Sequence, residues 1–310
     1  DRNHHVGRGC STRMELGVIG LGRMGQIVVE RTLAAGHTVV AYDRDTAAVD
    51  AAREAGAAGV DALEDVCDQL EGPPRLWLML PAGEAVDATL AALAPQLTDA
   101  AIVVDGGNSH HADSRRRADE TPAAYLDCGT SGGPASAEAG FSLMVGGPAD
   151  AYATMAPILD AVATGPEGHA HVGPAGAGHY VKMVHNGIEY ALMQAYGEGF
   201  ELLADGRYDL DLAQVADVWS AGAVIRSWLL ELIAEGFHAE GDALADVAPT
   251  VAGGTTGRWT LEAALAAEVP VPLLSAAVTE RYASRADDRL AHRIGNRLRY
   301  GFGRHPIERE

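Results

Sequence analysis

Residues 15–25 read ELGVIGLGRMG, a short apolar run that leads into the hexapeptide Gly20-Leu21-Gly22-Arg23-Met24-Gly25. This hexapeptide has the pattern G-x-G-x-x-G, which is typical of loops that bind the pyrophosphate of a dinucleotide. The first glycine allows a tight turn, the second lets the backbone approach the pyrophosphate, and the third lets the following helix pack against the strand. The N-terminus of that helix adds partial positive charge. The pattern therefore predicts that residues 20–25 bind a dinucleotide.

An acidic residue follows the next predicted strand. Residues 37–42 (HTVVAY) are rich in β-branched side chains, and Asp43 comes directly after them. A carboxylate at this position is expected to accept hydrogen bonds from the adenosine ribose and to repel a 2′-phosphate, so the sequence favours NAD over NADP. Arg44 could instead pair with a 2′-phosphate. A solvent-exposed turn without a binding role is the further alternative.

The rest of the chain predicts two kinds of structure. Further strand candidates lie at 76–80, 102–104, 125–127 and 142–145, separated by helical segments. This alternation favours an α/β Rossmann-type domain with a parallel sheet wound on both faces. After about residue 176 the segments have helical periodicity, for example 180–203, 211–233 and 261–267. We therefore predict a disordered extension over 1–13, a dinucleotide-binding domain over 14–175, an all-helical domain over 176–298 and a C-terminal arm over 299–310.

Composition argues against several classes of partner. The formal charge of −20 comes from 43 acidic and 23 basic residues, which disfavours binding to nucleic acid or to an anionic membrane. The apolar runs are too short to cross a bilayer, no secretory signal is visible, and three cysteines lack metal-site or disulfide spacing. We expect a cytoplasmic protein without a metal ion. The acidic excess and the scarcity of lysine are typical of proteins adapted to high salt.

The only lysine of the chain, Lys182, lies in a polar helical pattern. Lys182, His185, Asn186, Glu189 and Tyr190 share one stripe of a helix, because their offsets are 0, 3, 4, 7 and 8. Apolar residues occupy the other faces, so we expect the helix to be buried almost all round and the stripe to line a cavity. A hydrogen-bonded core network and a solvated face are the alternatives.

The single lysine also has a chemical argument behind it. A general base that acts on an alcohol must be able to lose its own proton. Arginine cannot do so in a protein, whereas a desolvated lysine can. All other basic residues of this chain are arginines, and the one lysine lies on the polar stripe. We therefore interpret Lys182 as a catalytic base, although chance could also have left one lysine there.

Several motifs together resemble those of 6-phosphogluconate dehydrogenases. The signature stretch is GAGHYVKMVHNGIEY at 176–190, and the other motifs occur in the same order as in that family: GLGRMG at 20–25, LPAG at 80–83, DGGNS at 105–109, GTSGGP at 129–134, SLMVGG at 142–147, GRWT at 257–260 and RYGFGRH at 299–305. The resemblance covers nearly all of the chain from Met14 onward, and the length is similar to that of the shorter bacterial and archaeal branch. It implies oxidative decarboxylation of 6-phosphogluconate to ribulose 5-phosphate.

The resemblance also implies a role for each matching residue. Lys182 would take the proton of the substrate 3-hydroxyl, Glu189 would protonate C1, and His185 and Asn186 would orient the hydroxyl and the developing oxyanion. The implied cofactor-binding residues are Gly20, Leu21, Gly22, Arg23, Met24, Gly25, Asp43, Arg44, Leu80, Pro81, Ala82 and Asn108. The implied substrate-binding residues are Asn108, Ser131, Gly132, Gly133, His185, Asn186, Tyr190, Thr256, Arg281, Arg299 and His305.

The tail and the phosphate pocket carry further implications. Arg299 and His305 match tail residues that reach into the site of a partner subunit, which implies a homodimer or tetramer with exchanged C-terminal arms. Tyr190, Thr256 and Arg281 match phosphate-binding positions. Long members of the family have a lysine two residues before the matching threonine, where this chain has Gly254. The phosphate would then depend on Arg281 and Arg299, with Arg258 as a further candidate.

Two other functions are open at this stage. A β-hydroxyacid dehydrogenase of the 3-hydroxyisobutyrate or tartronate semialdehyde type would share the fold and the catalytic lysine. Such enzymes lack the His-Asn-x-x-Glu-Tyr continuation and the arginine and histidine of the tail. A non-catalytic dinucleotide-sensing subunit is the second alternative, and it would not need both Lys182 and Glu189.

Overall fold

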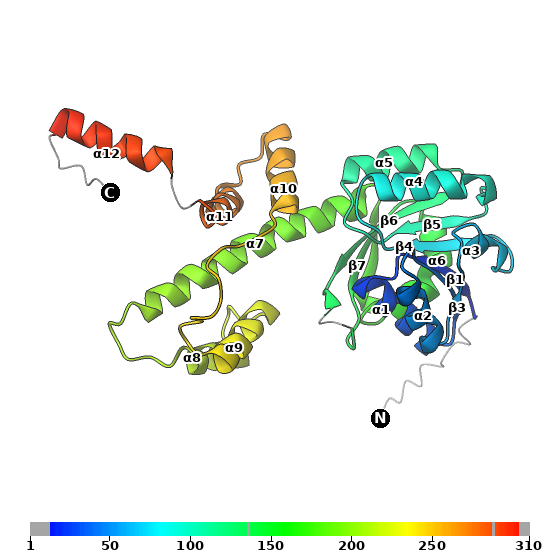
Figure 1. The fold of residues 1–310 in the computed structure, drawn as a ribbon, viewed down its shortest axis with the longest axis horizontal. Coiled ribbons are helices and arrows are strands. Elements are labelled where there is room, and N and C mark those ends of the chain that lie inside the picture. Colours follow the sequence, from blue (N-terminus) through cyan, green and yellow to red (C-terminus); the bar gives the residue numbers. More distant parts are fainter. Residues whose placement is uncertain (1–12, 135–136, 287–288, 304–310) are drawn as a thin grey trace, which may run out of the picture. The chain divides into compact units, whose positions relative to one another are not determined.

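The computed structural model of the protein describes residues 13–134, 137–286 and 289–303 (Figure 1). The chain divides into two compact units, Asp1–Val184 and His185–Glu310, and the division falls within the long helix α7 (Ala177–Ala204). Over the described residues, no helix is both long enough and apolar enough to cross a membrane. The predicted extension over 1–13 lies outside the described residues except for Arg13.

The first unit is built on one sheet. Its strands, over the described residues, are β1 (Glu15–Ile19), β2 (Thr38–Tyr42), β3 (Ala58–Gly59), β4 (Arg75–Leu78), β5 (Ile102–Asp105), β6 (Ala124–Ser131), β7 (Ser142–Gly146) and β8 (His169–Gly173). Their order in the sheet is β3-β2-β1-β4-β5-β6-β7-β8. β1 pairs in parallel with both β2 and β4, so the strand order reverses there. In open α/β sheets, ligands bind beyond the carboxyl ends of the strands at such a reversal.

Helices cover both faces of this sheet, as the sequence pattern predicts. The helical elements are α1 (Arg23–Ala34), α2 (Thr46–Ala55), α3 (Asp65–Asp68), α4 (Glu84–Leu93), η1 (Ala94–Gln96), α5 (His111–Glu120), α6 (Ala149–Val162) and η3 (Pro166–Gly168). One buried cluster joins the sheet to α1, α2 and α6, and a second joins it to α3 and α4. In Figure 1, α4 and α5 lie side by side on one face of the sheet.

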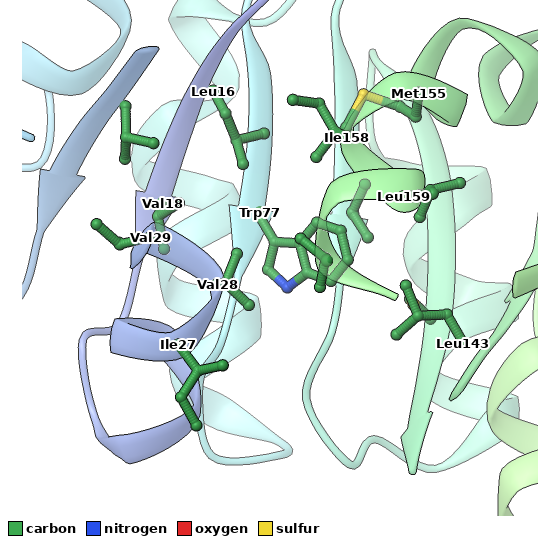
Figure 2. Close-up of a cluster of buried hydrophobic side chains, with 14 of the residues drawn as sticks. Leu16, Val18, Ile27, Val28, Val29, Trp77, Leu143, Met155, Ile158 and Leu159 are labelled. Carbon is green, nitrogen blue, oxygen red and sulfur yellow. The ribbon is translucent and has the colours of Figure 1, made fainter. Parts of the chain in front are cut away.

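Strand β4 shows how the two clusters are kept apart. Successive side chains of a strand point to opposite faces, so Trp77 belongs to one cluster while Leu76 and Leu78 belong to the other. Figure 2 shows Trp77 between Val28 of α1 and Ile158 of α6, and all three side chains are fully buried. Full burial of a large apolar side chain contributes roughly 1.5–3 kcal/mol, so this layer holds the helices firmly against the sheet.

The sheet is parallel, as predicted, except at one pair of strands. β7 is present where the sequence indicates a strand, but it runs antiparallel to β6. Residues 132–141 connect the two strands, and a parallel connection needs a crossover of about a dozen residues or more. The short connection therefore returns the chain in the opposite direction. Two further strands, β3 and β8, were not predicted.

The described part of the second unit is helical, as predicted. Beyond α7 it contains α8 (Leu212–Gly222), α9 (Trp228–Glu240), α10 (Thr255–Ala266), α11 (Pro272–Ala283) and α12 (Leu290–Gly303). The predicted helical segment 211–233 is in fact two helices. The Ser227 side chain accepts a hydrogen bond from the N–H of Leu230 and so caps the start of α9. Phe200, Leu230 and Phe237 belong to a buried cluster that joins α7, α8 and α9.

Candidate active site

The glycine turn after β1 needs two of its glycines for steric reasons. A Cβ on Gly20, whose φ is +94°, would lie 2.4 Å from the carbonyl oxygen of Met79. A Cβ on Gly25 would lie 1.9 Å from the carbonyl oxygen of Gly20. Gly22 is different, because nothing lies within 4 Å of the position its Cβ would take. Open space at the second glycine fits the approach of a pyrophosphate, so these residues fit a dinucleotide.

Asp43 holds this turn in place. Its Oδ2 atom accepts a 2.6 Å hydrogen bond from the backbone N–H of Leu21, and its Oδ1 atom accepts a 2.9 Å bond from the N–H of Asp45. The carboxylate thus lies directly beside the glycine turn, where the sequence places a ribose-binding group. Arg44 is exposed in the same turn. Arg23 and Met24 begin α1.

Two loops follow β4 and β5 and lie against each other. The first is Leu80-Pro81-Ala82-Gly83, and the second is the turn 105–109 that carries Asn108. A Cβ on Gly107 would lie 2.7 Å from the carbonyl oxygen of Leu80, and a Cβ on Gly106 would lie 2.3 Å from the indole nitrogen of Trp77. Two glycines are therefore required for this close approach. Asn108 itself is exposed at the tip of the turn.

A buried carboxylate fixes the start of α7. Asp127 is 0% exposed, and its two oxygens accept the N–H groups of Gly176 (2.7 Å) and His179 (2.8 Å). These are donors of a helix N-terminus that would otherwise be unsatisfied. A Cβ on Gly178 would lie 2.2 Å from the carbonyl oxygen of Asp127, so the helix starts in direct contact with β6.

This contact places the single lysine. A Cβ on Gly129 of β6 would lie 2.4 Å from the Cβ of Lys182. Lys182 is therefore seated on the strand that leads into the loop of Ser131, Gly132 and Gly133. Ser131 and Gly132 are half-buried, and the two glycines have positive φ angles of 131° and 63°. The structure thus brings together, within the first unit, the predicted base and the predicted substrate loop.

The other residues of the polar stripe follow along α7. His185 Nδ1 lies 3.2 Å from Asn186 Oδ1 and 3.7 Å from Glu189 Oε2. The side chains of His185 and Glu189 are 41% and 37% exposed. A histidine between an amide oxygen and a carboxylate can hold or pass a proton at this end of the helix.

The expectation that α7 is buried almost all round is wrong. Val181, Ile188, Leu192 and Met193 are 38%, 50%, 44% and 42% exposed. The sequence pattern is apolar on these faces, yet the described residues of the chain leave them partly uncovered.

A second group of predicted residues gathers in the helical unit. The guanidinium carbon of Arg281 lies 3.8 Å from the centre of the Tyr190 ring, and the Tyr190 hydroxyl lies 3.3 Å from Thr256 Oγ1. Thr256 is buried in the first turn of α10. A cation, two hydroxyls and a helix N-terminus together can bind an anion.

Sequence reasoning missed one arginine near this group. Arg285 donates from Nε to the carbonyl of Val251 (2.8 Å) and from Nη2 to the carbonyl of Gly253. A Cβ on Gly254 would lie 3.6 Å from Arg285 Nη2. Gly254 thus stands where long members of the family have a lysine, and the guanidinium group of Arg285 lies beside it. The signal was available, because Arg285 comes four residues after Arg281.

Three other predicted residues do not join this group in the described structure. Arg258 instead lies 3.3 Å from Glu262 on the exposed side of α10. The side chain of Arg299 and all of His305 lie outside the described residues, as does most of the predicted arm. α12 continues to Gly303, so the described part of that arm is helical. Over the described ranges no three His, Cys, Asp or Glu residues are grouped so that they could hold a metal ion.

Comparisons with known proteins match this arrangement. The sequence model described as "NAD binding domain of 6-phosphogluconate dehydrogenase" matches residues 15–175, and that described as "6-phosphogluconate dehydrogenase, C-terminal domain" matches 178–297. The chain is 64% identical to the NAD(+)-dependent, decarboxylating 6-phosphogluconate dehydrogenase of Haloferax volcanii, over 96% of this chain and 99% of that one.

Some of the more distant relatives are longer. The chain is 37% identical to the decarboxylating 6-phosphogluconate dehydrogenase of Bacillus licheniformis, over 89% of this chain but only 62% of that protein. The structure of Plasmodium falciparum 6-phosphogluconate dehydrogenase aligns with a TM-score of 0.80 at 29% identity, over 96% of this chain and 66% of that one. A 3-hydroxyisobutyrate dehydrogenase of Mycobacterium tuberculosis aligns with a TM-score of 0.69 at 23% identity, which shows a shared fold alone.

Proposed function

The chain belongs to the 6-phosphogluconate dehydrogenase family, and from this membership we propose that it converts 6-phosphogluconate to ribulose 5-phosphate and CO2 while it reduces NAD. The observation that carries this function is the 64% identity to an NAD-dependent, decarboxylating enzyme over 99% of that enzyme. The match to the C-terminal family domain favours this reaction over that of a β-hydroxyacid dehydrogenase.

Different residues of the chain carry out different steps of this reaction. Bound NAD supplies the hydride acceptor, and the glycine turn with Asp43 holds it. Lys182 accepts the proton of the substrate 3-hydroxyl as C3 is oxidised. The carboxylate then leaves as CO2, and the new ketone takes up the electrons. Glu189, seven residues from Lys182 and on the same helix face, donates a proton to the carbon that has lost CO2, which becomes C1 of ribulose 5-phosphate.

One assay tests the overall reaction. The protein is incubated at high KCl with 6-phosphogluconate and either NAD or NADP, and both reduced cofactor and released CO2 are followed. Turnover with CO2 release is expected, and NAD should be preferred. Absence of turnover with either cofactor would overturn the proposal. Turnover without CO2 would favour a β-hydroxyacid dehydrogenase instead.

The cofactor preference is expected to depend on Asp43. Asp43→Ala should narrow the ratio of kcat/KM for NAD over NADP by about 10-fold or more, because a hydrogen bond to a charged group contributes about 1.5–3 kcal/mol. Kinetics with both cofactors measure the ratio. Asp43→Asn is the matched variant, since its side-chain oxygen can still accept from the N–H of Leu21 while its charge is gone. An unchanged ratio in both variants would refute the role of Asp43.

We also place the substrate phosphate between Arg281 and Arg285. Arg281 lies over Tyr190, and Arg285 lies beside Gly254, so the two guanidinium groups flank the start of α10. Guanidinium groups bind phosphate in a bidentate manner, which makes Arg285 a substitute for the lysine that long members have. Tyr190 and Thr256 supply hydroxyl groups to the same anion.

Arg285→Ala is expected to raise KM for 6-phosphogluconate about 10-fold with little change in kcat, because one charge-assisted hydrogen bond to the phosphate is lost. Steady-state kinetics over a range of substrate concentrations give both constants. Arg258→Ala is the comparison, since Arg258 pairs with Glu262 and should leave KM unchanged. The reverse result, with KM raised only by Arg258→Ala, would contradict the assignment.

The active assembly is proposed to be a homodimer or a larger even oligomer with exchanged C-terminal arms, to which Arg299 and His305 belong. What supports it is the apolar surface of the second unit. On α12, Leu290, Ile294 and Leu298 recur every four residues and are 68%, 49% and 59% exposed. Such a stripe needs a partner surface. Sedimentation at high KCl checks the mass, and a monomer with full activity would refute this assembly.

A further inference from the structure

Arg117 of α5 is the most completely bonded buried cation that the described part of the first unit contains. Its side chain is 1% exposed. Nε donates to Asp87 Oδ1 at 2.8 Å, and Nη2 donates to the carbonyl oxygen of Gly83 at 3.0 Å. Nη1 donates to Ser109 Oγ at 3.0 Å and to Asp105 Oδ2 at 3.3 Å. The hydrogen bond from Arg117 holds the pKa of the Asp87 carboxyl below its usual range.

Three of these acceptors belong to two different loops, and the fourth, Asp87, lies in α4. Gly83 ends the loop 80–83 after β4, and Asp105 and Ser109 are the two ends of the turn 105–109 after β5. Arg117 therefore links the two loops through its hydrogen bonds to Gly83, Asp105 and Ser109. These bonds do not involve Leu80 or Asn108. Breaking these hydrogen bonds costs free energy, because a buried polar or charged group that loses its partner cannot bond to water instead.

The turn has a second support beneath it. Asp105 is fully buried, and its Oδ2 atom also accepts from Ser109 Oγ (2.8 Å) and from the Tyr125 hydroxyl (2.7 Å). Its Oδ1 atom accepts from the N–H of Gly107 at 3.1 Å. The backbone on both sides of Asn108 is thus tied to Asp105, and Asp105 is tied to Arg117. Arg117 thereby links the turn that carries Asn108 to the loop 80–83.

We propose that Arg117 is a positioning residue for hydride transfer, which keeps the turn of Asn108 in fixed register with the loop of Leu80, Pro81 and Ala82. This inference rests on the proposed function, in which both loops line the cofactor. Because its side chain is only 1% exposed, we assign Arg117 no direct contact with the cofactor or the substrate. It acts through Ser109 and Asp105 on one side and through Gly83 on the other.

Lysine cannot replace this arginine. The guanidinium group presents a rigid planar set of donors that reaches Asp87, Gly83 and Ser109 at once, whereas an ammonium group is a single point on a flexible stem. Arg117→Lys therefore keeps the positive charge but loses some of the hydrogen bonds that link the two loops. A displacement of about 1 Å at a reacting group can cost about 10²-fold in rate, so kcat is expected to fall by roughly 10- to 100-fold.

Arg116→Lys is the matched control. Arg116 is the next residue, is 43% exposed, and also pairs with Asp87 (2.9 Å), but it reaches Glu120 rather than the two loops. It should retain wild-type kinetics. Both variants and the wild type are assayed at high KCl with 6-phosphogluconate carrying either hydrogen or deuterium at C3, and NAD affinity and thermal stability are measured in parallel.

The isotope effect separates positioning from mere folding. If Arg117 positions the loops, Arg117→Lys lowers kcat and raises the deuterium isotope effect on kcat, because hydride transfer becomes more rate-limiting. An unchanged kcat, or a loss that follows the folded fraction with an unchanged isotope effect, overturns the inference. If Arg117→Lys does not fold, the same criteria are applied to Ser109→Ala, which removes only the hydroxyl that accepts a hydrogen bond from Arg117. A wild type without turnover refutes the proposed function itself.

Discussion

Lys182→Arg is expected to lower kcat by about 10²- to 10⁴-fold, which is the usual contribution of a general base. The replacement keeps the positive charge and much of the length of the side chain, so binding of an anionic substrate should be retained. It removes the ability to accept a proton, because arginine stays protonated in proteins. Steady-state kinetics at high KCl with 6-phosphogluconate and NAD measure the loss. KM for NAD should change little.

The scarcity of lysine allows an independent check. Because Lys182 is the only lysine of the chain, an amine-specific reagent can modify only this side chain and the N-terminal amine. Peptide mapping of the labelled protein then reports the state of Lys182 directly. Substrate should slow its labelling, and the labelled enzyme should lose activity in proportion. A Lys182→Arg variant that stays fully active, or labelling that leaves activity intact, would show that another group is the base.

Local spacing was sufficient to predict the glycine turn and most of the strands of the first unit. The glycine turn, Asp43 and the alternation of strands with helices depend on contacts within one strand–helix unit, and the structure has each of them. Gly25 shows why, because the carbonyl oxygen that excludes its Cβ belongs to Gly20 of the same turn. The spacing of the polar stripe on α7 was also correct, because helical periodicity is a property of the segment itself.

The features that could not be predicted depend on contacts with residues that are distant in the sequence. Strand β7 runs antiparallel because its connection is short, and no residue of β7 itself carries that information. Arg117 looks like a surface arginine in the sequence, yet its side chain donates a hydrogen bond to the backbone carbonyl of Gly83. The burial of α7 was predicted wrongly because an apolar pattern does not say whether the cover comes from the same chain.

The close contact between Gly129 of β6 and Lys182 predicts a second large effect on kcat. Gly129→Ala should lower kcat by about 10²-fold, although Gly129 has no functional group. Its Cβ would lie 2.4 Å from the Cβ of Lys182 and 2.7 Å from the carbonyl oxygen of Gly178, whereas contacts of 3.4 Å and above are ordinary. The start of α7 must therefore move by about 1 Å, and a displacement of that size at a catalytic group can cost about 10²-fold in rate.

This effect can be separated from a general loss of stability. Overpacking of this kind costs about 1–3 kcal/mol, so the melting temperature should fall, and kcat is compared well below the melting temperatures of both proteins. Gly129 is not among the glycines with positive φ, so alanine strains only the contact with α7. Gly236→Ala in α9 is the matched control, since nothing lies within 4 Å of the Cβ it adds. That variant should keep wild-type kcat. If Gly129→Ala keeps it too, Lys182 does not work from its seat on β6, and the base must act from a different position of α7.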